Sequence, residues 1–234
     1  MGHGRFVLKF AAFAIAFLLI GTSAWADIVT VSVTGQVWRV FGNWGNAPTA
    51  DPVASGTSTA DVPVIKQTEM SFTASQVNFS ASGAQTLADF LFSGGAVYSD
   101  TTGASDLMSN CSDSAFNSST DCYSTVIRLT GTYDFLAGTT YTINHDDGVV
   151  LFAGGTTTNR LPAGSELPTV DVASSWTPSV DTGLLGFTIY YMGTNGNPED
   201  LQLSQSTVPD GGATLMLLGG ALLGLGTLRR KFRV

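Results

Sequence analysis

The sequence predicts an all-β protein: an antiparallel β-sandwich of jelly-roll-like type, with an apolar segment added at each end of the chain. Three observations favour this fold. In the middle of the chain, apolar and polar residues alternate with period two, as on strands that have one face in a core and the other in water. Gly, Pro, Asn and Asp interrupt these runs at short intervals, which indicates antiparallel hairpins. The two end segments are apolar and flanked by cations, so they address the chain to a membrane and contribute nothing to the core.

The first 26 residues have the pattern of a secretory signal peptide. Two cations, Arg5 and Lys9, precede the uncharged apolar run Phe10–Ile20. Ala24 and Ala26 fit the small-x-small rule, so signal peptidase should cut after Ala26 and leave a mature chain that starts at the next residue. The alternative is a retained N-terminal membrane helix.

Residues 27–207 form the expected exported domain, which is large enough for one hydrophobic core. Seventeen carboxylates face four cations there, a net charge of −13 (4 minus 17). Such a surface repels nucleic acid and attracts divalent cations. The plainer reading of the acidity is solubility outside the cell.

The strands are expected in chain order wherever the alternation holds, and one short helix interrupts them. Gly42–Thr59 has no period and is expected to be a long loop. Leu87, Phe90 and Leu91 share a helical face, which predicts the helix. The expected elements are strands at Val29–Thr34 and Met70–Ser75, a helix within Ala84–Phe92, and strands at Ile127–Phe135, Thr140–Asn144, Val149–Ala153 and Phe187–Tyr191.

Two cysteines, Cys111 and Cys122, bracket a polar loop rich in Ser, Asn and Asp. In an exported protein a disulfide is their natural state. Closing a loop of this length stabilises a fold by roughly 3 kcal/mol in the chain-entropy model. Metal ligation is the alternative, but no histidine lies near them in the sequence.

An acidic corner, Asp146-Asp147-Gly148, separates two of the expected strands. Adjacent carboxylates repel each other unless a cation lies between them, and a hard cation such as Ca²⁺ prefers oxygen ligands. Gly148 is expected to let the chain turn sharply with a positive φ. The alternative is a solvent-exposed hairpin corner without a ligand, and the residues alone favour that alternative.

No enzyme is predicted. The nucleophile elbow, the His-Glu-x-x-His zinc motif and the phosphate loop are absent from the sequence. The alternative is a glycosidase-like pair of Asp146 and Asp147, but residues next to each other on an extended strand point to opposite faces, whereas a retaining pair lies about 5–5.5 Å apart across a sugar. His145 is the one histidine of the mature domain. Trp44, in a Gly/Asn-rich stretch, is a candidate sugar-stacking platform, whereas Trp38 is expected in the core.

The last 27 residues have three parts: a Val-Pro-Asp-Gly-Gly motif, an apolar run over residues 213–228, and a basic end over 229–234. The run is about 24 Å long as a helix, short of the roughly 30 Å hydrocarbon core, which suits a transient membrane stop.

The layout of the tail resembles the Val-Pro-Asp variant of the PEP-CTERM sorting tails, although that variant often continues with Ser-Gly. The resemblance implies a single transmembrane helix, recognition by an exosortase (a membrane cysteine protease-transpeptidase), and release or attachment at the envelope, often in bacteria that make exopolysaccharide. An ordinary membrane anchor is the alternative. The matching residues are Val208, Pro209, Asp210, Gly211, Gly212, Arg229, Arg230 and Lys231.

The stretch from Tyr123 to Leu203 carries short motifs in a family-like order: Gly131-Thr132-Tyr133-Asp134-Phe135, Tyr141-Thr142-Ile143, Asp146-Asp147-Gly148-Val149-Val150-Leu151, Gly154-Gly155, Phe187-Thr188-Ile189-Tyr190-Tyr191 and Leu201-Gln202-Leu203. These motifs resemble the middle of the anthrax protective-antigen-type β-sandwich and its GLEYA relatives among adhesins. In the calcium-dependent lectin members, paired aspartates and a loop asparagine bind Ca²⁺, and sugar hydroxyls complete the coordination. The resemblance implies that Asp146 and Asp147 are a metal pair, with Asn195 or Asn197 as the loop ligand and Asn195 near the sugar. The N-terminal third of the domain shows no match.

Two functions follow from the sequence. The first is an exported surface or extracellular-matrix protein, sorted by an exosortase, with weak Ca²⁺-dependent binding of a carbohydrate such as exopolysaccharide. The second is a structural envelope or matrix protein with no small ligand.

Overall fold

The computed structural model describes residues 26–41, 65–81, 86–100, 104–105, 123–167, 169–193, 199–207, 219–220 and 222. The chain divides into two compact units, one of Met1–Trp25 with Ser206–Val234 and one of Ala26–Gln205. In the first unit, residues 219, 220 and 222 are helical. Within the described part of the chain, no helix is long and apolar enough to cross a membrane.

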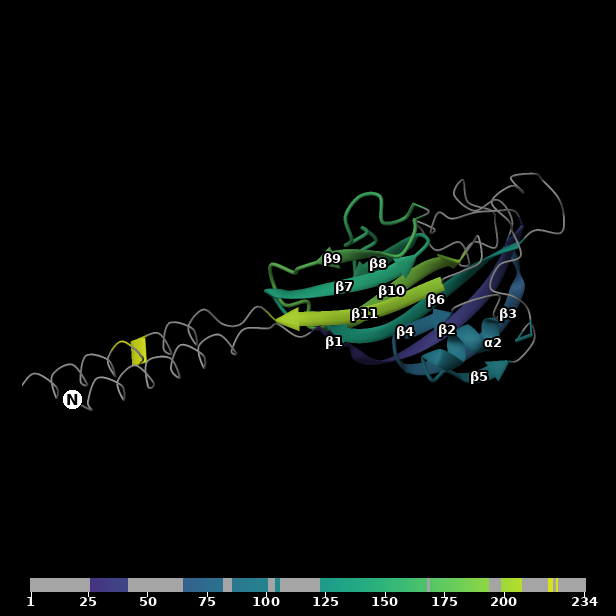
Figure 1. Ribbon diagram of the computed structural model, residues 1–234, viewed down its shortest axis with the longest axis horizontal. Helices are drawn as coiled ribbons and strands as arrows, with labels where there is room; N and C mark the ends of the chain where they lie inside the picture. The colour runs from purple at the N-terminus through teal and green to yellow at the C-terminus, as the bar shows by residue number, and fades with distance from the viewer. Residues whose placement is uncertain are drawn as a thin grey trace, which may run out of the picture. The chain divides into compact units, whose positions relative to one another are not determined.

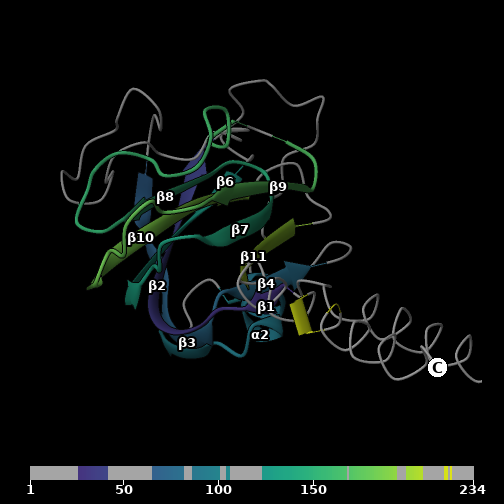
Figure 2. The ribbon, with the colours of Figure 1, turned by 90° about the vertical axis from the view of Figure 1, so that its left-hand side faces the viewer.

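The second unit is built from two antiparallel sheets, which confirms the predicted all-β sandwich (Figures 1 and 2). One sheet has the order β1-β11-β7-β9, and β4 also pairs with β11. The other has the order β5-β3-β2-β6-β10-β8. The strands are β1 Asp27–Ile28, β2 Thr30–Phe41, β3 Ile65–Gln76, β4 Asn78–Ala81, β5 Val97–Asp100, β6 Tyr123–Asp134, β7 Thr139–Asp146, β8 Val149–Ala153, β9 Val172–Trp176, β10 Leu184–Gly193 and β11 Glu199–Thr207.

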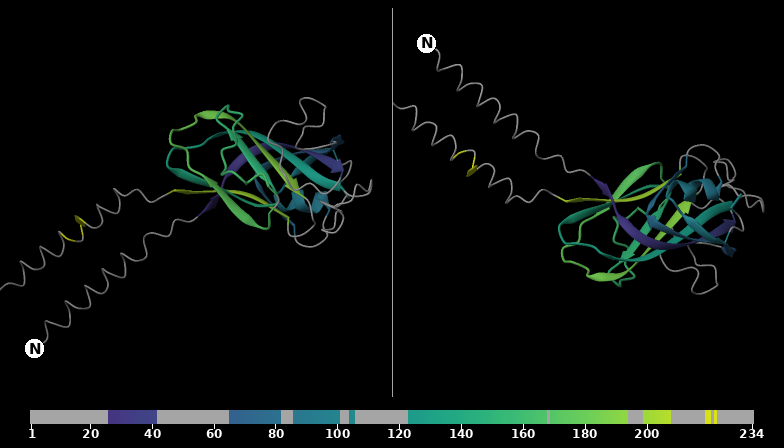
Figure 3. Two further views of the ribbon diagram at one scale, coloured as in Figure 1. Left: turned by 90° about the horizontal axis from the view of Figure 1, so that it is seen from above. Right: turned by 90° about the horizontal axis from the view of Figure 1, so that it is seen from below.

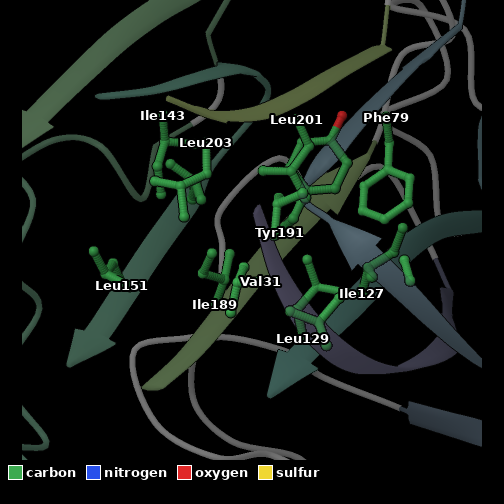
Figure 4. Packing of buried hydrophobic residues seen from close by; sticks show 14 of the residues in the cluster. Val31, Phe79, Ile127, Leu129, Ile143, Leu151, Ile189, Tyr191, Leu201 and Leu203 are labelled. Carbon is green, nitrogen blue, oxygen red and sulfur yellow. The ribbon is translucent and has the colours of Figure 1, made fainter. Parts of the chain in front are cut away.

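The period-two alternation of the sequence is visible in the burial of the strands. Along β7, buried and half-buried residues alternate without a break. The inward side chains of both sheets form one core, part of which is labelled in Figure 4. Trp38 is buried as expected, but in a second cluster on the opposite face of the six-stranded sheet, with Val126, Val150, Tyr190 and Met192.

The expected helix is present as α2, Leu87–Ser93, and a capping box explains where it begins. The Asp89 backbone N–H donates to Thr86 Oγ1 over 3.2 Å, and the Thr86 N–H donates to Asp89 Oδ2 over 3.1 Å. The side-chain and then the backbone hydrogen bond from Thr86 lower the pKa of Asp89. Leu87, Phe90 and Leu91 are buried, as their shared face predicted.

The prediction of successive hairpins was wrong for most of the domain. Among the described strands, β2 and β3 are the one consecutive pair that is hydrogen-bonded in a common sheet. From β6 to β11 the chain changes sheet at every connection, so β7 pairs with β9, and β8 pairs with β10. Figure 3 shows the layered strands of this unit from above and from below. Turn residues end a strand both in a hairpin within one sheet and in a connection between two sheets. Alternation identifies the buried face of a strand but does not identify its partner strand.

Candidate functional site

Carboxylates gather at one end of the sheet that contains β11, β7 and β9. Because neighbouring strands in this sheet are antiparallel, the last residue of β7 lies near the first residues of β9 and β11. The Cα register pairs His145 with Val172, so the residue after His145 and the residue before Val172 meet at this end. We call the following group the acidic cluster: Asp146, Asp147, Asp171, Glu199 and Asp200.

The Asp-Asp-Gly corner is a connection between the two sheets, since it joins β7 to β8. Asp147 is buried, with 4% of its surface exposed, and Asp146 is half-buried. The alternative of a solvent-exposed hairpin corner is therefore wrong. Gly148 is also not among the glycines with a positive φ, contrary to expectation. Instead, its carbonyl accepts a hydrogen bond from the Met192 N–H over 2.9 Å, which ties the corner to β10.

His145 fixes the corner from inside the fold. Its side chain is 1% exposed, with Nδ1 2.5 Å from the Asp147 carbonyl oxygen and Nε2 2.9 Å from Ser174 Oγ. A carbonyl can only accept, so Nδ1 carries the proton and Nε2 accepts from the Ser174 hydroxyl. Burial, the largest influence, lowers the pKa of His145 and favours this neutral tautomer. The histidine therefore contacts the backbone of Asp147 and acts as a structural link between β7 and β9.

Glu199 is the most deeply buried carboxylate of the cluster, with 2% of its surface exposed. Its Oε2 is 2.6 Å from the Tyr191 hydroxyl, which also contacts the Asp146 carbonyl oxygen. Burial raises the pKa of Glu199 well above its usual value, and the nearby charges of Asp147 and Asp146 add to this effect. Burial likewise raises the pKa of Tyr191, followed by the influence of Glu199. Figure 4 shows the Tyr191 ring among core side chains near Leu201.

Asp146 and Asp200 are less buried than Glu199, and burial is the main cause of the raised pKa of each. Burial raises the pKa of Asp146 to about 6, and the charge of the exposed Asp171 contributes further. Burial also raises the pKa of Asp200 to about 6, again followed by Asp171. The cluster is thus a region where negative charge is disfavoured and where a cation would relieve both burial and repulsion.

The oxygen atoms of the acidic cluster favour some metal ions over others. The cluster offers carboxylate and carbonyl oxygens, which suit a hard cation such as Ca²⁺ better than a thiolate- or imidazole-preferring metal. An orphaned oxygen is also present, since Glu199 Oε1 is buried and has no hydrogen-bond partner in the described structure. However, no three His, Cys, Asp or Glu side chains of the described residues are grouped closely enough to hold a metal ion.

Several predicted site residues lie outside the described residues: the loop asparagines, the candidate stacking tryptophan, the two cysteines, the first cleavage-site alanine and the sorting motif with its basic end. Ala26 is described and exposed, directly before β1. Those outside are Asn195, Asn197, Trp44, Cys111, Cys122, Ala24, Val208, Pro209, Asp210, Gly211, Gly212, Arg229, Arg230 and Lys231. Residues 194–198 connect Gly193 at the end of β10 to Glu199 at the start of β11, so chain connectivity attaches the Asn loop to the acidic cluster.

Sequence reasoning missed Tyr191 as a hydrogen-bonding residue, and Asp171, Glu199 and Asp200 as members of the cluster. A signal existed for two of them: Glu199 and Asp200 directly precede an apolar strand, as Asp146 and Asp147 do. Recognising it required the knowledge that β11 neighbours β7, which periodicity does not supply.

Comparisons with known proteins identify the C-terminal tail. Residues 207–232 match the VPDSG-CTERM motif. This motif marks proteins that are exported to the cell surface or the extracellular space, and a sorting tail of this kind implies processing by an exosortase. The predicted sorting-tail resemblance and the predicted localisation are thereby confirmed.

Two solved structures are similar to the chain at low identity. The PA14 domain of the MpAFP antifreeze protein is 16% identical, with 76% of this chain and 82% of that chain covered and a TM-score of 0.45. The A domain of epithelial adhesin 6 from Candida glabrata, solved with Galβ1-3GlcNAc, is 14% identical, with 81% and 85% covered and a TM-score of 0.33. No curated protein matches the chain.

Proposed function

We propose that this exported β-sandwich binds carbohydrate weakly through a Ca²⁺ ion held at the acidic cluster. The observation that carries the proposal is the placement of Asp146, Asp147 and Glu199 at one end of the sheet, where burial and the charges of nearby carboxylates raise the pKa of Asp146 and of Glu199. A divalent cation would neutralise them and satisfy the orphaned oxygen of Glu199.

The residues around the proposed cation would have different roles. Asp146 and Asp147 would supply carboxylate oxygens, and an oxygen of Asn195 or Asn197 would complete the protein's share of ligands. His145 keeps the corner in place through its hydrogen bonds to the Asp147 carbonyl and to Ser174. Ca²⁺ takes six to eight oxygens, so positions remain for the hydroxyls of a sugar, and Trp44 would offer its ring to the sugar face.

Ca²⁺ binding is tested by thermal melts of the domain in millimolar Ca²⁺ and in chelator. Affinity on the order of 10⁻⁴–10⁻³ M is expected, as for other extracellular modules. A tenfold excess over Kd then stabilises the fold by about 1.4 kcal/mol. For a domain of this size that corresponds to a rise of roughly 3–6 °C in Tm. A wild-type Tm that ignores Ca²⁺ up to 10 mM would reject the cation, and with it the sugar mechanism.

Carbohydrate binding is tested separately on a glycan array that includes bacterial exopolysaccharides. Binding is expected in Ca²⁺ and is expected to disappear with chelator and in an Asp147→Asn variant. Signals that persist in chelator would place any sugar site away from the acidic cluster.

The second candidate is a structural envelope or matrix protein without a small ligand. One observation favours it: within the described residues no ready-made group of metal-binding side chains exists. Under this hypothesis the acidic cluster is a buried structural junction, and both the melts and the array show no effect of Ca²⁺.

Sorting has its own test, which holds for either candidate. Because the tail matches a sorting motif, intact-mass analysis of protein from the native host is expected to show a form that starts at Asp27 and lacks residues 229–234. A full-length C-terminus in the envelope fraction would contradict processing of the tail.

A further inference from the structure

Exposed aliphatic side chains gather at the end of the sandwich formed by the β6–β7 turn and the β9–β10 loop. Leu136 lies in the turn and Val180 in the loop, and they are 47% and 70% exposed. Leu184 and Leu185 begin β10 and are 75% and 45% exposed. We call these four residues the apolar tip. Apolar side chains grouped on a surface cost free energy in water, so such a group indicates a partner that covers it.

Hydrogen bonds join the two loops that carry the apolar tip. Thr182 exchanges two of them with Phe135: its N–H donates to the Phe135 carbonyl over 3.0 Å, and its Oγ1 accepts from the Phe135 N–H over 2.9 Å. The Gly138 N–H donates to the Pro178 carbonyl over 3.0 Å. Leu136, between Phe135 and Gly138, is thereby carried on a backbone that is fixed on both sides. The fold thus presents the tip in a set arrangement, which lowers the entropic cost of covering it.

The side chains of the apolar tip point in more than one direction. Leu184 and Leu185 are neighbours on a strand, so their side chains leave opposite faces of β10. A folded protein partner would have to enclose the end of the sandwich from both sides to cover them together. A lipid layer is fluid and surrounds apolar groups that point in different directions. The shape of the tip therefore fits a membrane surface better than a second folded surface.

Strand β11 runs to this same end of the sandwich. Gln205 Oε1 accepts from the Tyr133 hydroxyl over 2.9 Å, and Tyr133 is the register partner of Leu185 in the tip. The strand ends at Thr207, and five residues separate it in the sequence from the uncharged apolar run over 213–228, which is predicted to enter a bilayer. A fully extended chain covers at most about 3.6 Å per residue, so this tether spans no more than about 20 Å. The covalent chain alone therefore keeps this end of the domain close to the membrane that the run enters.

We propose that the apolar tip contacts the surface of the lipid bilayer into which the tail inserts, and that this contact orients the domain before the tail is processed. The inference is independent of the proposed Ca²⁺ site and rests on the predicted membrane run of the tail. The contact would be shallow. The Asp181 carboxylate accepts from the Ala137 N–H over 2.7 Å at this same tip, and a charged group stays in the headgroup layer while aliphatic neighbours reach the acyl boundary.

The test uses the full chain, inserted through its tail into vesicles of phosphatidylcholine and phosphatidylethanolamine with brominated acyl chains, which quench tryptophan on contact. Val180→Trp places a reporter in the apolar tip, and Val170→Trp is the matched control. Both are loop valines beside β9, one after it and one before it, and they are 70% and 78% exposed. Val170 adjoins Asp171 of the acidic cluster at the other end of that strand. Wild type gives the signal of the native tryptophans, and chelator is present throughout.

Brominated lipid is expected to quench the added tryptophan of Val180→Trp at least about twofold more than that of Val170→Trp, because only the first reaches the acyl boundary. Leu184→Ser, added to Val180→Trp, is expected to reduce this quenching, since the tip then loses one of its apolar side chains. The serine replaces a side chain that is 75% exposed, so the fold is retained.

The other outcomes overturn the inference. Equal quenching of the two variants, or stronger quenching of Val170→Trp, would show that the tail brings the domain to the bilayer without this end facing it. A full chain that does not associate with the vesicles would remove the premise of the inference and with it the lipid contact. If Val180→Trp is not quenched and its emission shifts to the blue as protein concentration rises without vesicles, a second copy of the chain covers the tip instead of lipid. Because these measurements are made in chelator, their failure is distinct from a failure of the Ca²⁺ melts.

Discussion

Replacing His145 by Phe is expected to destabilise the domain through two hydrogen bonds and with little change in packing. Phenylalanine fills nearly the same space in the core but offers no nitrogen. The Asp147 carbonyl oxygen and Ser174 Oγ then lose partners that lie at 2.5 and 2.9 Å in the native fold. Both residues are at most 9% exposed, so water does not readily replace the histidine.

The expected loss of stability follows from the burial of the Asp147 carbonyl oxygen and Ser174 Oγ, which lose their hydrogen-bond partner in the variant. Leaving a buried polar group without a partner costs about 1–3 kcal/mol. Two such groups, partly relieved by rearrangement, give about 3 kcal/mol, or roughly 6–12 °C in Tm for a domain of this size. Ser174→Ala removes one of the two hydrogen bonds and is expected to cost about 1–2 kcal/mol. Ser175→Ala changes an exposed residue that is hydrogen-bonded to Thr142 over 2.8 Å, and should stay within about 0.5 kcal/mol.

Urea unfolding followed by tryptophan fluorescence measures the three variants against wild type. The expected order of destabilisation is His145→Phe, then Ser174→Ala, then Ser175→Ala. A loss below 1 kcal/mol for His145→Phe would falsify the view that this side chain secures the acidic corner. A larger loss for Ser174→Ala than for His145→Phe would show that the serine has another role.

Three further predictions concern the core, the cysteines and pH. Gly35→Ala is expected to cost about 1–3 kcal/mol, because its Cβ would lie 2.0 Å from the Phe72 ring; Gly186→Ala, whose nearest atom is 4.0 Å away, is the control in the same urea assay. Peptide mapping of the exported protein without reductant is expected to find the two cysteines joined, and two free thiols would contradict this. Above about pH 7.5, His145 is almost entirely neutral in the folded and unfolded states, because its folded pKa is lowered from an ordinary value near 6.5, so carboxyl groups with raised folded pKa values dominate the pH dependence. Because the folded pKa of Glu199 exceeds its unfolded value, the folded state holds a proton that the unfolded state releases, and stability falls as pH rises. In chelator, Tm is therefore expected to fall between about pH 7.5 and 9, and to fall less in Glu199→Gln.

The sequence was sufficient for the fold class because burial has a local signature. Alternation located the inward residues of β7. Strand β8 is buried on both faces, and its bounds, Val149–Ala153, are those that its apolar run predicts. Strand order has no such signature. The residues that end β7 are the same in a hairpin turn as in a crossover between sheets, so the expected hairpins were wrong at this point.

The candidate site could be predicted only where its residues are neighbours in the sequence. Asp146 and Asp147 are adjacent in the sequence, and their repulsion is evident without a structure. Glu199 is more than fifty positions away and reaches them only because β11 lies beside β7. Its contact with Tyr191 depends on the side-chain packing of β10, which no periodicity encodes. The Asn loop and Trp44 lie outside the described residues, and their roles stay predictions.

Strand β11 begins at the acidic cluster and ends directly before the sorting motif in the sequence. Its first residue, Glu199, belongs to the acidic cluster, and its last, Thr207, directly precedes the Val-Pro-Asp motif. Eight residue steps along a strand span about 27 Å. At the far end of the strand, Gln205 pairs with Asp27, so the N-terminus expected after cleavage of the signal peptide lies away from the cluster.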